Sequence, residues 1–389
     1  METDIAIVGA GPAGLSFARL LASSGLHITV IDRQSGAALA VPEFDGRDIA
    51  LTRRSVCLLR ELGVWQRLAD EDRPEIRRAR VLDGNSPYTL DFDPAGRNDA
   101  ALGHIVSNHL IRQALYAEVC SLDNVELRTG TGVEDLKSGL ARATLTLADG
   151  NTLRARLIAA ADSRFSETRR MAGISASMHD FGRVCIVCRM THEEPHDATA
   201  FECFHYERTL AILPLTSNES SIVVTAGMDQ RDAIMAMSDT AFADDIRRRF
   251  GSRYGCMTLS SKRFAYPLVG VHATRFHGGR VALVGDAAVG MHPVTAHGYN
   301  LGLSGAALLA RLVIRAAARG DDIGAGRLLQ AYSLRHQLST RPMYHGTNEI
   351  VKIFTDDRKP ARLVRTMALR AANRLPAVRR AIRHKLTYA

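Results

Sequence analysis

The stretch Gly9-Ala10-Gly11-Pro12-Ala13-Gly14 stands directly after the apolar segment Ile5-Ala6-Ile7-Val8, near the start of a chain of 389 residues. The apolar segment predicts a strand over residues 4–8, and the residues that follow predict a helix from Ala13 to Ser24. In such a unit the first glycine of G-x-G-x-x-G permits the tight turn and the second lets a pyrophosphate approach the backbone. The third lets the helix pack on the strand, and the helix N-terminus then faces the phosphate charge.

A second strand, Ile28-Thr29-Val30-Ile31, follows and leads into Asp32, which lies 18 residues after Gly14. A carboxylate at this place can accept hydrogen bonds from ribose hydroxyls. Glycines alone would be weak support for a nucleotide site. The strands, the helix and the acidic residue together predict a dinucleotide-binding unit of the Rossmann type.

A second glycine-containing stretch, Gly285-Asp286-Ala287-Ala288, begins 271 residues after the last glycine of the first. It follows an apolar strand predicted at residues 280–284. Met291-His292-Pro293 and Gly298-Tyr299-Asn300-Leu301-Gly302 come after it and lead into a helix predicted from Leu301 to Arg319. The order of the two signals predicts one domain that wraps a flavin, FAD, with both of its ends.

The middle of the chain differs from both ends, because residues 183–190, 200–214 and 221–227 alternate or run apolar between turn residues. This pattern favours a β-rich domain. The expected fold class is α/β plus α+β, a split Rossmann-like FAD-binding domain with an inserted β-sheet substrate domain and a helical C-terminal segment. The expected ranges are 1–75, 100–175 and 270–340 for the FAD-binding domain, 76–99 and 176–269 for the substrate domain, and 341–389 for the basic C-terminal segment.

Composition indicates a soluble globular protein, with 46% hydrophobic and 23% charged residues. No uninterrupted apolar run reaches the ~18 residues that span a bilayer, and no secretory signal precedes the first strand, so a cytoplasmic protein is expected. Six cysteines in this length argue against a disulfide framework. Cys185 and Cys188 lie three apart on a predicted strand and therefore point to opposite faces, as two core thiols rather than zinc ligands.

Three ordered motifs resemble the fingerprints of the class A FAD-dependent aromatic hydroxylases, the para-hydroxybenzoate-hydroxylase-like family. They are the Gly9–Gly14 stretch, Ala161-Asp162, and Gly285–Ala288 together with residues 298–302. The resemblance covers essentially the whole chain. It implies a fold with one FAD-binding domain and one substrate domain, and a reaction that needs FAD.

Within this family the chain is most similar to the ubiquinone-biosynthesis hydroxylases. The similarity rests on Phe44-Asp45-Gly46-Arg47-Asp48-Ile49-Ala50-Leu51-Thr52, on Leu62-Gly63-Val64-Trp65, and on His292-Pro293 with residues 300–303. It implies a lipophilic polyprenylphenol, a quinone precursor, as the substrate. It also implies a quinone-biosynthesis complex as a partner.

The resemblance implies site residues one by one. Asp286 would hydrogen-bond the ribityl chain, and the amides of residues 298–300 would lie near the pyrimidine end of the flavin. The implied cofactor contacts are Gly9, Gly11, Pro12, Ala13, Gly14, Asp32, Arg33, Arg47, Asn108, Val133, Asp162, Gly285, Asp286, Pro293, Gly298, Tyr299 and Asn300. Pro293 and His292 are the candidate catalytic residues and Tyr266 is a further candidate base, with a structural role as the alternative for His292 and Tyr266.

Two positions depart from the family pattern. Ser163 follows Asp162 where the family usually has glycine, which puts the local turn and any nicotinamide contact of that motif in question. His297 stands where glutamine is common, and it either tunes the flavin or packs.

The implied chemistry is indirect. NAD(P)H, a transient co-substrate, reduces FAD; reduced FAD adds dioxygen; and the resulting flavin C4a-hydroperoxide hydroxylates the aromatic ring of the phenol. The protein then has to position the ring and exclude water, so neither a Ser/His/Asp set nor a metal cluster is required. The absence of a second G-x-G-x-x-G unit argues against reductases that bind two dinucleotides.

Two other function classes stay open. One is a soluble phenol or salicylate-type flavin hydroxylase. The other is a non-oxygenase flavoprotein, such as an isoprenoid reductase or a flavin-binding assembly component. Flavin halogenases are set aside, because they carry a Trp-rich motif and this chain has only Trp65.

The net charge of +9 comes from the C-terminal tail. Ten Lys or Arg and no acidic residue lie from Arg358 onward, which leaves 40 basic and 41 acidic groups before it. Residues 363–365, 367–370 and 377–383 mix apolar residues with arginines at helical spacing. A basic amphipathic segment suits an anionic membrane, so peripheral contact with the inner face of the membrane is expected, with a solvated terminal helix as the alternative. Nucleic-acid binding is not expected, since no such motif is present.

Overall fold

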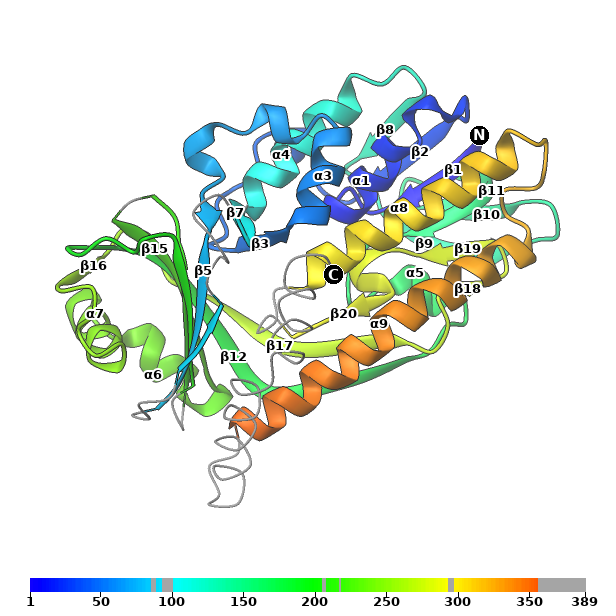
Figure 1. Cartoon of the computed structure of the whole chain (residues 1–389). Helices are drawn as coiled ribbons and strands as arrows, with labels where there is room; N and C mark the ends of the chain where they lie inside the picture. The colour runs from blue at the N-terminus through cyan, green and yellow to red at the C-terminus, as the bar shows by residue number, and fades with distance from the viewer. Residues whose placement is uncertain (85–88, 93–100, 205–207, 217, 293–296, 356–389) are drawn as a thin grey trace.

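The computed structural model describes residues 1–84, 89–92, 101–204, 208–216, 218–292 and 297–355. This part of the chain forms two large sheets and one small sheet, with helices packed against them (Figure 1). The helices are α1 (Pro12–Leu20), α2 (Gly36–Ala40), α3 (Arg53–Glu61), α4 (Asn108–Cys120), α5 (Glu167–Met171), α6 (Arg231–Ala236), α7 (Asp239–Arg249), α8 (Gly298–Ala317) and α9 (Gly326–Thr355).

The first sheet has a parallel centre in the order β19-β11-β1-β2-β8. These strands are β1 (Glu2–Val8), β2 (Ile28–Asp32), β8 (Val125–Thr129), β11 (Thr152–Ala160) and β19 (Val281–Leu283), and the antiparallel ones are β9 (Val133–Ser138), β10 (Ala143–Leu147) and β18 (His277–Gly278). β19 pairs with β11 although six strands of the second sheet, β12 to β17, lie between them in sequence. The expected split Rossmann-like fold is therefore confirmed.

The second sheet is the inserted one, in the order β20-β17-β12-β15-β14-β13-β5-β6, with β16 beside β12. Its strands are β5 (Arg78–Asp83), β6 (Thr89–Phe92), β12 (Ala176–His192), β13 (Thr199–Phe204), β14 (Thr209–Pro214), β15 (Glu219–Gly227), β16 (Met257–Leu259), β17 (Phe264–Ala273) and β20 (Val289–Gly290). The apolar stretch at residues 200–214 proves to be two strands, which pair as a hairpin. Helices α6 and α7 cover one face of this sheet (Figure 1).

A small third sheet consists of β3 (Asp48–Thr52), β7 (Gly103–Ser107) and β4 (Glu75–Ile76). Along the chain, its strands follow β2 of the first sheet and flank β5 and β6 of the second. Strand β3 pairs antiparallel with β7 along its whole length. Because β3 follows residues 44–47 and β7 leads into α4, this sheet brings residues 45–48 beside residues 107–108. It positions the junction between the two domains.

Two predicted helices have different ends in the structure. α1 stops at Leu20 rather than Ser24, because a 3-10 turn at Ala22–Ser24 and left-handed Gly25 (φ +69°) terminate it. α8 begins at Gly298, three residues earlier than predicted, because residues 298–300 form its first turn.

Helix α9 runs without a break across the boundary predicted at residue 340, even though it contains Pro342. The Tyr332 hydroxyl donates to the carbonyl of Leu283 over 2.7 Å, and Tyr344 is buried on the other side of that boundary. The folded body thus continues past residue 340. The amphipathic segments predicted within residues 363–383 lie outside the described residues.

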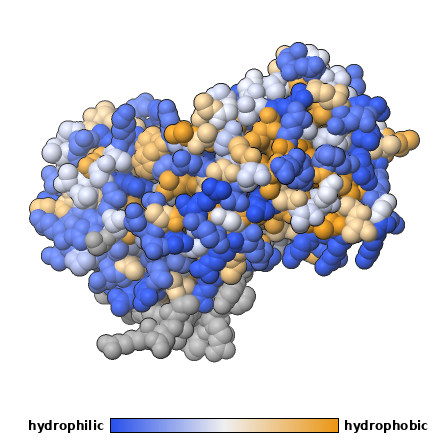
Figure 2. All heavy atoms as spheres, turned by 90° about the horizontal axis from the view of Figure 1, so that it is seen from above, coloured by the Kyte–Doolittle hydropathy of each residue, from blue (hydrophilic) through white to orange (hydrophobic). Residues whose placement is uncertain are grey.

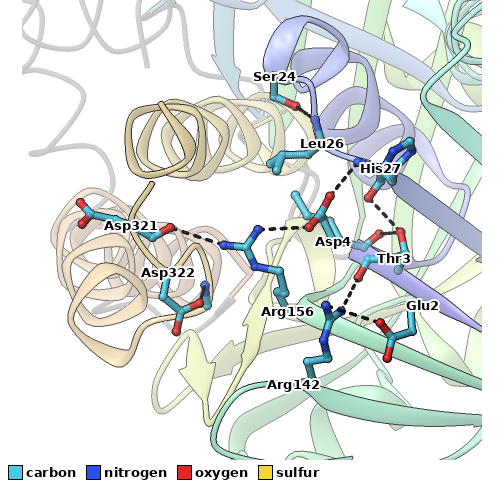
Figure 3. Close-up of polar contacts among 12 residues, drawn as sticks. Glu2, Thr3, Asp4, Ser24, Leu26, His27, Arg142, Arg156, Asp321 and Asp322 are labelled. Carbon is cyan, nitrogen blue, oxygen red and sulfur yellow. Dashed lines mark hydrogen bonds and ion pairs between the residues drawn. The ribbon is translucent and has the colours of Figure 1, made fainter. Parts of the chain in front are cut away.

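Polar contacts lock the amino-terminal ends of the parallel strands (Figure 3). Arg156 of β11 pairs with Asp4 of β1 over 3.1 Å, and the other carboxylate oxygen of Asp4 accepts from the backbone N–H of His27 over 3.0 Å. Arg156 also donates to the carbonyl of Asp321, after α8. These contacts lie at the strand ends opposite to the glycine turns, so they stabilise the sheet away from the predicted cofactor.

Seen from above, the surface is mostly hydrophilic, with hydrophobic residues interspersed toward the middle of each lobe (Figure 2). Helix α8 is long and apolar enough to span a membrane, since its most apolar 18-residue segment has a mean hydropathy of 1.3. However, 61% of that segment is buried inside the protein, as in a core helix. The Cys185 and Cys188 thiols are both buried and contribute to different apolar clusters, which confirms that they are core thiols on opposite faces of β12. The residues that the structure describes contain no cluster suited to a metal ion.

Candidate flavin site

The first glycine turn depends on close backbone contacts. Gly9 has φ +109°, and a Cβ on it would lie 2.5 Å from the carbonyl oxygen of Ala161. A Cβ on Gly14 would lie 1.9 Å from the carbonyl oxygen of Gly9. A Cβ on Gly11 would meet no heavy atom within 4 Å. The turn therefore excludes side chains where β1 and α1 pack, and it leaves open space in front of Gly11 and the N-terminus of α1.

Asp32, at the end of β2, holds this turn. One carboxylate oxygen accepts from the N–H of Ala10 over 2.7 Å and the other accepts from the N–H of Gln34 over 2.7 Å. Each oxygen has a second lone pair, so the predicted ribose contact stays open. The Asp32 carboxylate therefore fixes the glycine turn through the N–H of Ala10, and it lies at the end of β2 where the nucleotide is expected.

A cavity of about 310 Å³ lies beyond β2, lined by Arg33, Gly130, Thr131, Gly132, Val133, Glu134 and Ala148. The Oγ1 atom of Thr131 is buried here without a hydrogen-bond partner. Arg33 is turned toward Glu167 in an ion pair between exposed side chains. The predicted contacts Arg33 and Val133 therefore line one cavity, and the Thr131 hydroxyl beside them has no hydrogen-bond partner in the described part of the chain.

The second glycine stretch closes against the first. Gly285 has φ +62°, and a Cβ on it would lie 2.6 Å from the Cβ of Ala13. A Cβ on Gly302, in α8, would lie 3.2 Å from the Cα of Gly285. Residues 13, 285 and 302 thus meet at one point, where a side chain is excluded at Gly285 and would be tight at Gly302.

Asn300 has a role that the sequence did not suggest. Its side chain is 1% exposed, accepts from the N–H of Thr52 over 3.0 Å and donates to the carbonyl of Ala50 over 2.9 Å. It therefore ties α8 to β3. The predicted amide contacts of Gly298, Tyr299 and Asn300 concern the same helix N-terminus, which carries no acidic residue in its first turn.

Asp286 and Asp162 both have protein partners. Asp286 accepts from Arg164 over 2.9 Å, and Arg164 also donates to the carbonyl of Val269. Asp162 accepts from the Ser166 hydroxyl over 2.5 Å and from the backbone and hydroxyl of Thr168, at the start of α5. The carboxylate of Asp162 therefore caps its own turn, although Ser163 replaces the usual glycine. Arg164 was missed, and its place two residues after Asp162 was the only signal for it.

Asp45 is the centre of a polar cluster at the domain junction. Its carboxylate accepts from Arg47 over 2.6 Å and from the side chain of Asn108 over 2.8 Å, and its carbonyl accepts from the Tyr266 hydroxyl over 2.7 Å. Burial acts to raise the pKa of Asp45, but the hydrogen bonds and the charge of Arg47 outweigh it, so the pKa lies below 3.8. The structure thus joins predicted residues 47 and 108 through a carboxylate that was not predicted.

A second junction contact is a buried ion pair. Arg189 of β12 donates to Asp48 over 2.7 Å and also bonds the Ser107 hydroxyl, and the Asp48 side chain is fully buried. The Arg189 guanidinium lies 4.8 Å from the ring centre of Phe44. These contacts hold the second sheet against residues 44–48, and the sequence did not predict them.

His292 is buried and lies edge-on to Phe181, 4.8 Å between ring centres. Burial, and then the charge of Arg183, lower its pKa to about 4, so the imidazole is neutral at pH 7. Pro293 lies outside the described residues. His297 precedes α8 and is also buried.

These features fit FAD. The open space at Gly11 lies at the N-terminus of α1, which carries no acidic residue in its first turn and can face a pyrophosphate. The cavity at Val133 has room for a polar ring, and the buried Thr131 hydroxyl beside it has no partner among the described residues. The N-terminus of α8 can favour negative charge on a flavin. The individual contacts remain predictions.

Comparisons with known proteins show the family of this chain. A model of the FAD binding domain family matches residues 2–343. The chain is 47% identical to the ubiquinone hydroxylase UbiM of Neisseria meningitidis, over 100% of this chain and 85% of that protein. It is 36% identical to the ubiquinone hydroxylase UbiL of Rhodospirillum rubrum, over 98% and 89%.

Among solved structures, the p-nitrophenol 4-monooxygenase PnpA of Pseudomonas putida has a TM-score of 0.77 at 19% identity, covering 99% of this chain and 98% of that one, which supports the fold. The turns, the split sheet and these matches agree. The chain therefore belongs to the FAD binding domain family, among the flavin-dependent aromatic hydroxylases.

Proposed function

We propose that this protein hydroxylates the aromatic ring of a polyprenylated phenol in ubiquinone biosynthesis, with FAD as cofactor, NAD(P)H as reductant and dioxygen as oxidant. The observation that carries this proposal is the identity of 47% along the whole chain to a relative named as a ubiquinone hydroxylase. A second relative with that name is 36% identical over 98% of the chain.

When bound, FAD supplies the activation of dioxygen. The glycine turns at residues 9–14 and 285, which meet at Ala13, would together hold the cofactor between them. Asp45, Arg47 and Asn108 form a hydrogen-bonded cluster that fixes the loop next to the second sheet. Arg189 and Asp48 hold that sheet against the FAD-binding domain at the junction.

In this proposal the candidate bases, His292 and Tyr266, shape the substrate space and do not accept a proton. His292 has a pKa of about 4, which makes it a weak base at neutral pH. Tyr266 donates its hydroxyl hydrogen to the carbonyl of Asp45, and burial raises its pKa above 10, so the phenol stays protonated. Both side chains help to shape the space for the ring rather than remove its proton.

The tail suggests how such a substrate is reached. Ten basic residues and no acidic one after position 357 suit an anionic membrane surface, and we propose peripheral contact there and a place in a quinone-biosynthesis complex. Sedimentation with anionic and neutral liposomes tests the contact. Binding to anionic vesicles at low salt that is lost in a variant with Arg379, Arg380 and Arg383 changed to Gln supports it. Equal sedimentation of both proteins contradicts it.

The activity test uses FAD-loaded protein, NADPH and a short-chain prenylphenol under ¹⁸O₂. We expect one labelled hydroxyl group in the product, measured by mass spectrometry. Turnover of salicylate but not of the prenylphenol would favour the soluble-hydroxylase alternative. Substrate-dependent NADPH oxidation without oxygen uptake would favour a non-oxygenase flavoprotein.

A further inference from the structure

The two faces of the second sheet are covered differently. On the face under α6 and α7, strand residues are almost fully buried, as Ile186, Ile212 and Ile222 show at 0% exposure. On the opposite face, which we call the inner face, residues such as Ala211 and Val223 are only partly buried. The inner face is the one that turns toward the FAD-binding domain. Contact across it is local and leaves part of the face accessible.

Strand pairing places Glu202 on the inner face. Glu202 of β13 pairs with Val81 of β5 on one side and with Ala211 of β14 on the other. From Ala211 the same row continues through Val223 and Val187. Since paired residues share a face, one row of side chains runs across the sheet with a single carboxyl group in it.

The far end of this row lies at the candidate flavin site. Val187 pairs with Phe264 of β17, and a Cβ on Gly46 would lie 2.6 Å from the Phe264 ring and 2.9 Å from the Val187 side chain. Residues 45–48 are the segment that contains Asp45 and Arg47. Four strand spacings separate Glu202 from Phe264, about 19 Å. A substituted aromatic ring is shorter than this distance, so it would occupy only part of the row.

Glu202 and Ala211 belong to neither of the apolar clusters that flank them. Val81 packs with one cluster, around Ile105 and Leu90. Val223 belongs to the other, around Val187 and Leu268. Between these clusters the inner face carries the small side chain of Ala211 and the carboxyl group of Glu202, and both residues are only partly buried.

The Glu202 carboxyl group has no hydrogen-bond or ion-pair partner in the part of the chain that the structure describes, and burial raises its pKa to about 8. The ionisable groups that sense its charge are the thiols of Cys185 on β12 and Cys203 on β13. Burial raises the pKa of each thiol to about 12, so both stay neutral. An unpartnered carboxyl group that is partly removed from water is destabilising, and a ligand that hydrogen-bonds it recovers that loss.

We propose that Glu202 is a substrate-binding residue, whose carboxyl group hydrogen-bonds an oxygen substituent of a neutral aromatic ring that lies on the inner face between Ala211 and Phe264. This inference rests on the proposed function and adds to it how the ring is recognised. The same carboxyl group disfavours aromatic acids, because their carboxylate would meet a second acidic group on an apolar surface.

The test compares FAD-loaded wild type with Glu202→Leu and Glu202→Gln, by titrating 4-alkylphenols while the flavin absorbance is followed. We expect Glu202→Leu to bind the phenol about tenfold more weakly, because a hydrogen bond is lost, while Glu202→Gln stays within about threefold. Because a bound ring removes more water from the carboxyl group, it favours the protonated form. Wild-type affinity should therefore fall as pH rises past about 8, and the affinity of Glu202→Gln should not.

A matched control is Glu126→Leu, on an exposed position of β8 at the edge of the first sheet, which should leave binding unchanged. Glu202→Leu should also melt no lower than wild type, since an unpartnered carboxyl group is replaced by an apolar side chain. Equal phenol affinity in wild type and Glu202→Leu, the same pH profile in wild type and Glu202→Gln, or no phenol binding by wild type overturns the proposal.

Binding and turnover separate the two ideas. If wild type binds phenols in the expected Glu202-dependent way but hydroxylates no prenylphenol, the proposed function fails and the role of Glu202 stands. If wild type hydroxylates prenylphenol and the Glu202→Leu variant has an unchanged KM, the role of Glu202 fails and the proposed function stands.

Discussion

At Gly9, Gly14 and Gly285, atoms of neighbouring segments approach so closely that a Cβ would meet one of them at 2.6 Å or less. Along the inner face of the second sheet, Glu202 and Ala211 lie between two apolar clusters and are only partly buried. The first region uses the absence of side chains to close the fold, and the second leaves side chains available to a ligand. Substitutions in the first should therefore affect folding, and those in the second should affect binding.

The largest expected effect comes from comparing the Gly14→Ala and Gly11→Ala variants, which tests whether the glycine turn is needed for folding. The new methyl group on residue 14 would lie 1.9 Å from a backbone oxygen, so we expect a loss of about 3 kcal/mol or more in the free energy of unfolding. Residue 11 has φ −75° and open space, so its alanine variant should fold normally and lose FAD affinity. Urea unfolding and FAD titration measure both effects. A Gly14→Ala protein as stable as wild type contradicts the argument.

The next largest effect is expected where the two regions are joined. Asp48→Asn weakens the buried pair with Arg189 and should cost about 2–3 kcal/mol, less than for a wholly buried pair because Arg189 is 24% exposed. Asp70→Asn is the control, since Asp70 is 90% exposed in its pair with Arg73 and should change stability by less than about 0.5 kcal/mol. Thermal unfolding of the two variants compares them, and equal losses would count against a structural role for the junction pair.

The two carboxyl groups, Asp45 and Glu202, should respond to pH in opposite ways. The pKa of Glu202 rises from 4.5 to about 8 on folding, so its favourable contribution is complete below pH 4.5 and is lost as pH rises through 8. Glu202→Gln should therefore gain stability over wild type between pH 5 and 9, by about 2 kcal/mol, since water reaching the half-buried side chain reduces the full linkage effect.

Asp45 has the lowered pKa, so its contribution is present above pH 3.8 and is lost only as pH falls below that value. The loss in Asp45→Asn should accordingly be constant between pH 5 and 9. Urea unfolding at several pH values measures both variants. A Glu202→Gln difference that does not change with pH would show that this carboxyl group is hydrated in the folded protein.

The smallest effect is expected in the cavity beside β2. Thr131→Val removes a buried hydroxyl that has no protein partner, so the unliganded protein should be as stable as wild type or slightly more so. FAD affinity should fall about fivefold, or about 1 kcal/mol, if the hydroxyl bonds the cofactor. Thr144→Val, on β10 of the same sheet, should leave FAD affinity unchanged. Equal FAD affinity in wild type and Thr131→Val would remove this hydroxyl from the site.

Much of the fold follows from local patterns. Gly9, Gly14 and Gly285 could be recognised because each is needed for a close approach that a side chain would block, and the strands beside them are short apolar runs. The ends of helices were less predictable. Gly25 ends the first helical region only after a 3-10 turn, and α8 includes residues 298–300, because both ends depend on packing as well as on propensity.

The site residues divide in the same way. Asp32, Asp286 and Asn108 were predicted from their positions, but their partners Ala10, Arg164 and Asp45 were not. Asn300 was predicted for its backbone, and its side chain proved to tie α8 to β3 across about 250 residues of sequence. Such partners come together only when distant elements pack.

The sequence by itself determined that the chain wraps a dinucleotide with its two ends, because the glycines that permit those turns are required locally and leave a short, readable pattern. Only the tertiary structure decided that Glu202 lies on the inner face of the second sheet. In a strand, a shift of one residue in register moves every side chain to the other face, and the register of β13 is set by its pairing with β5 and β14. No local pattern carries that information.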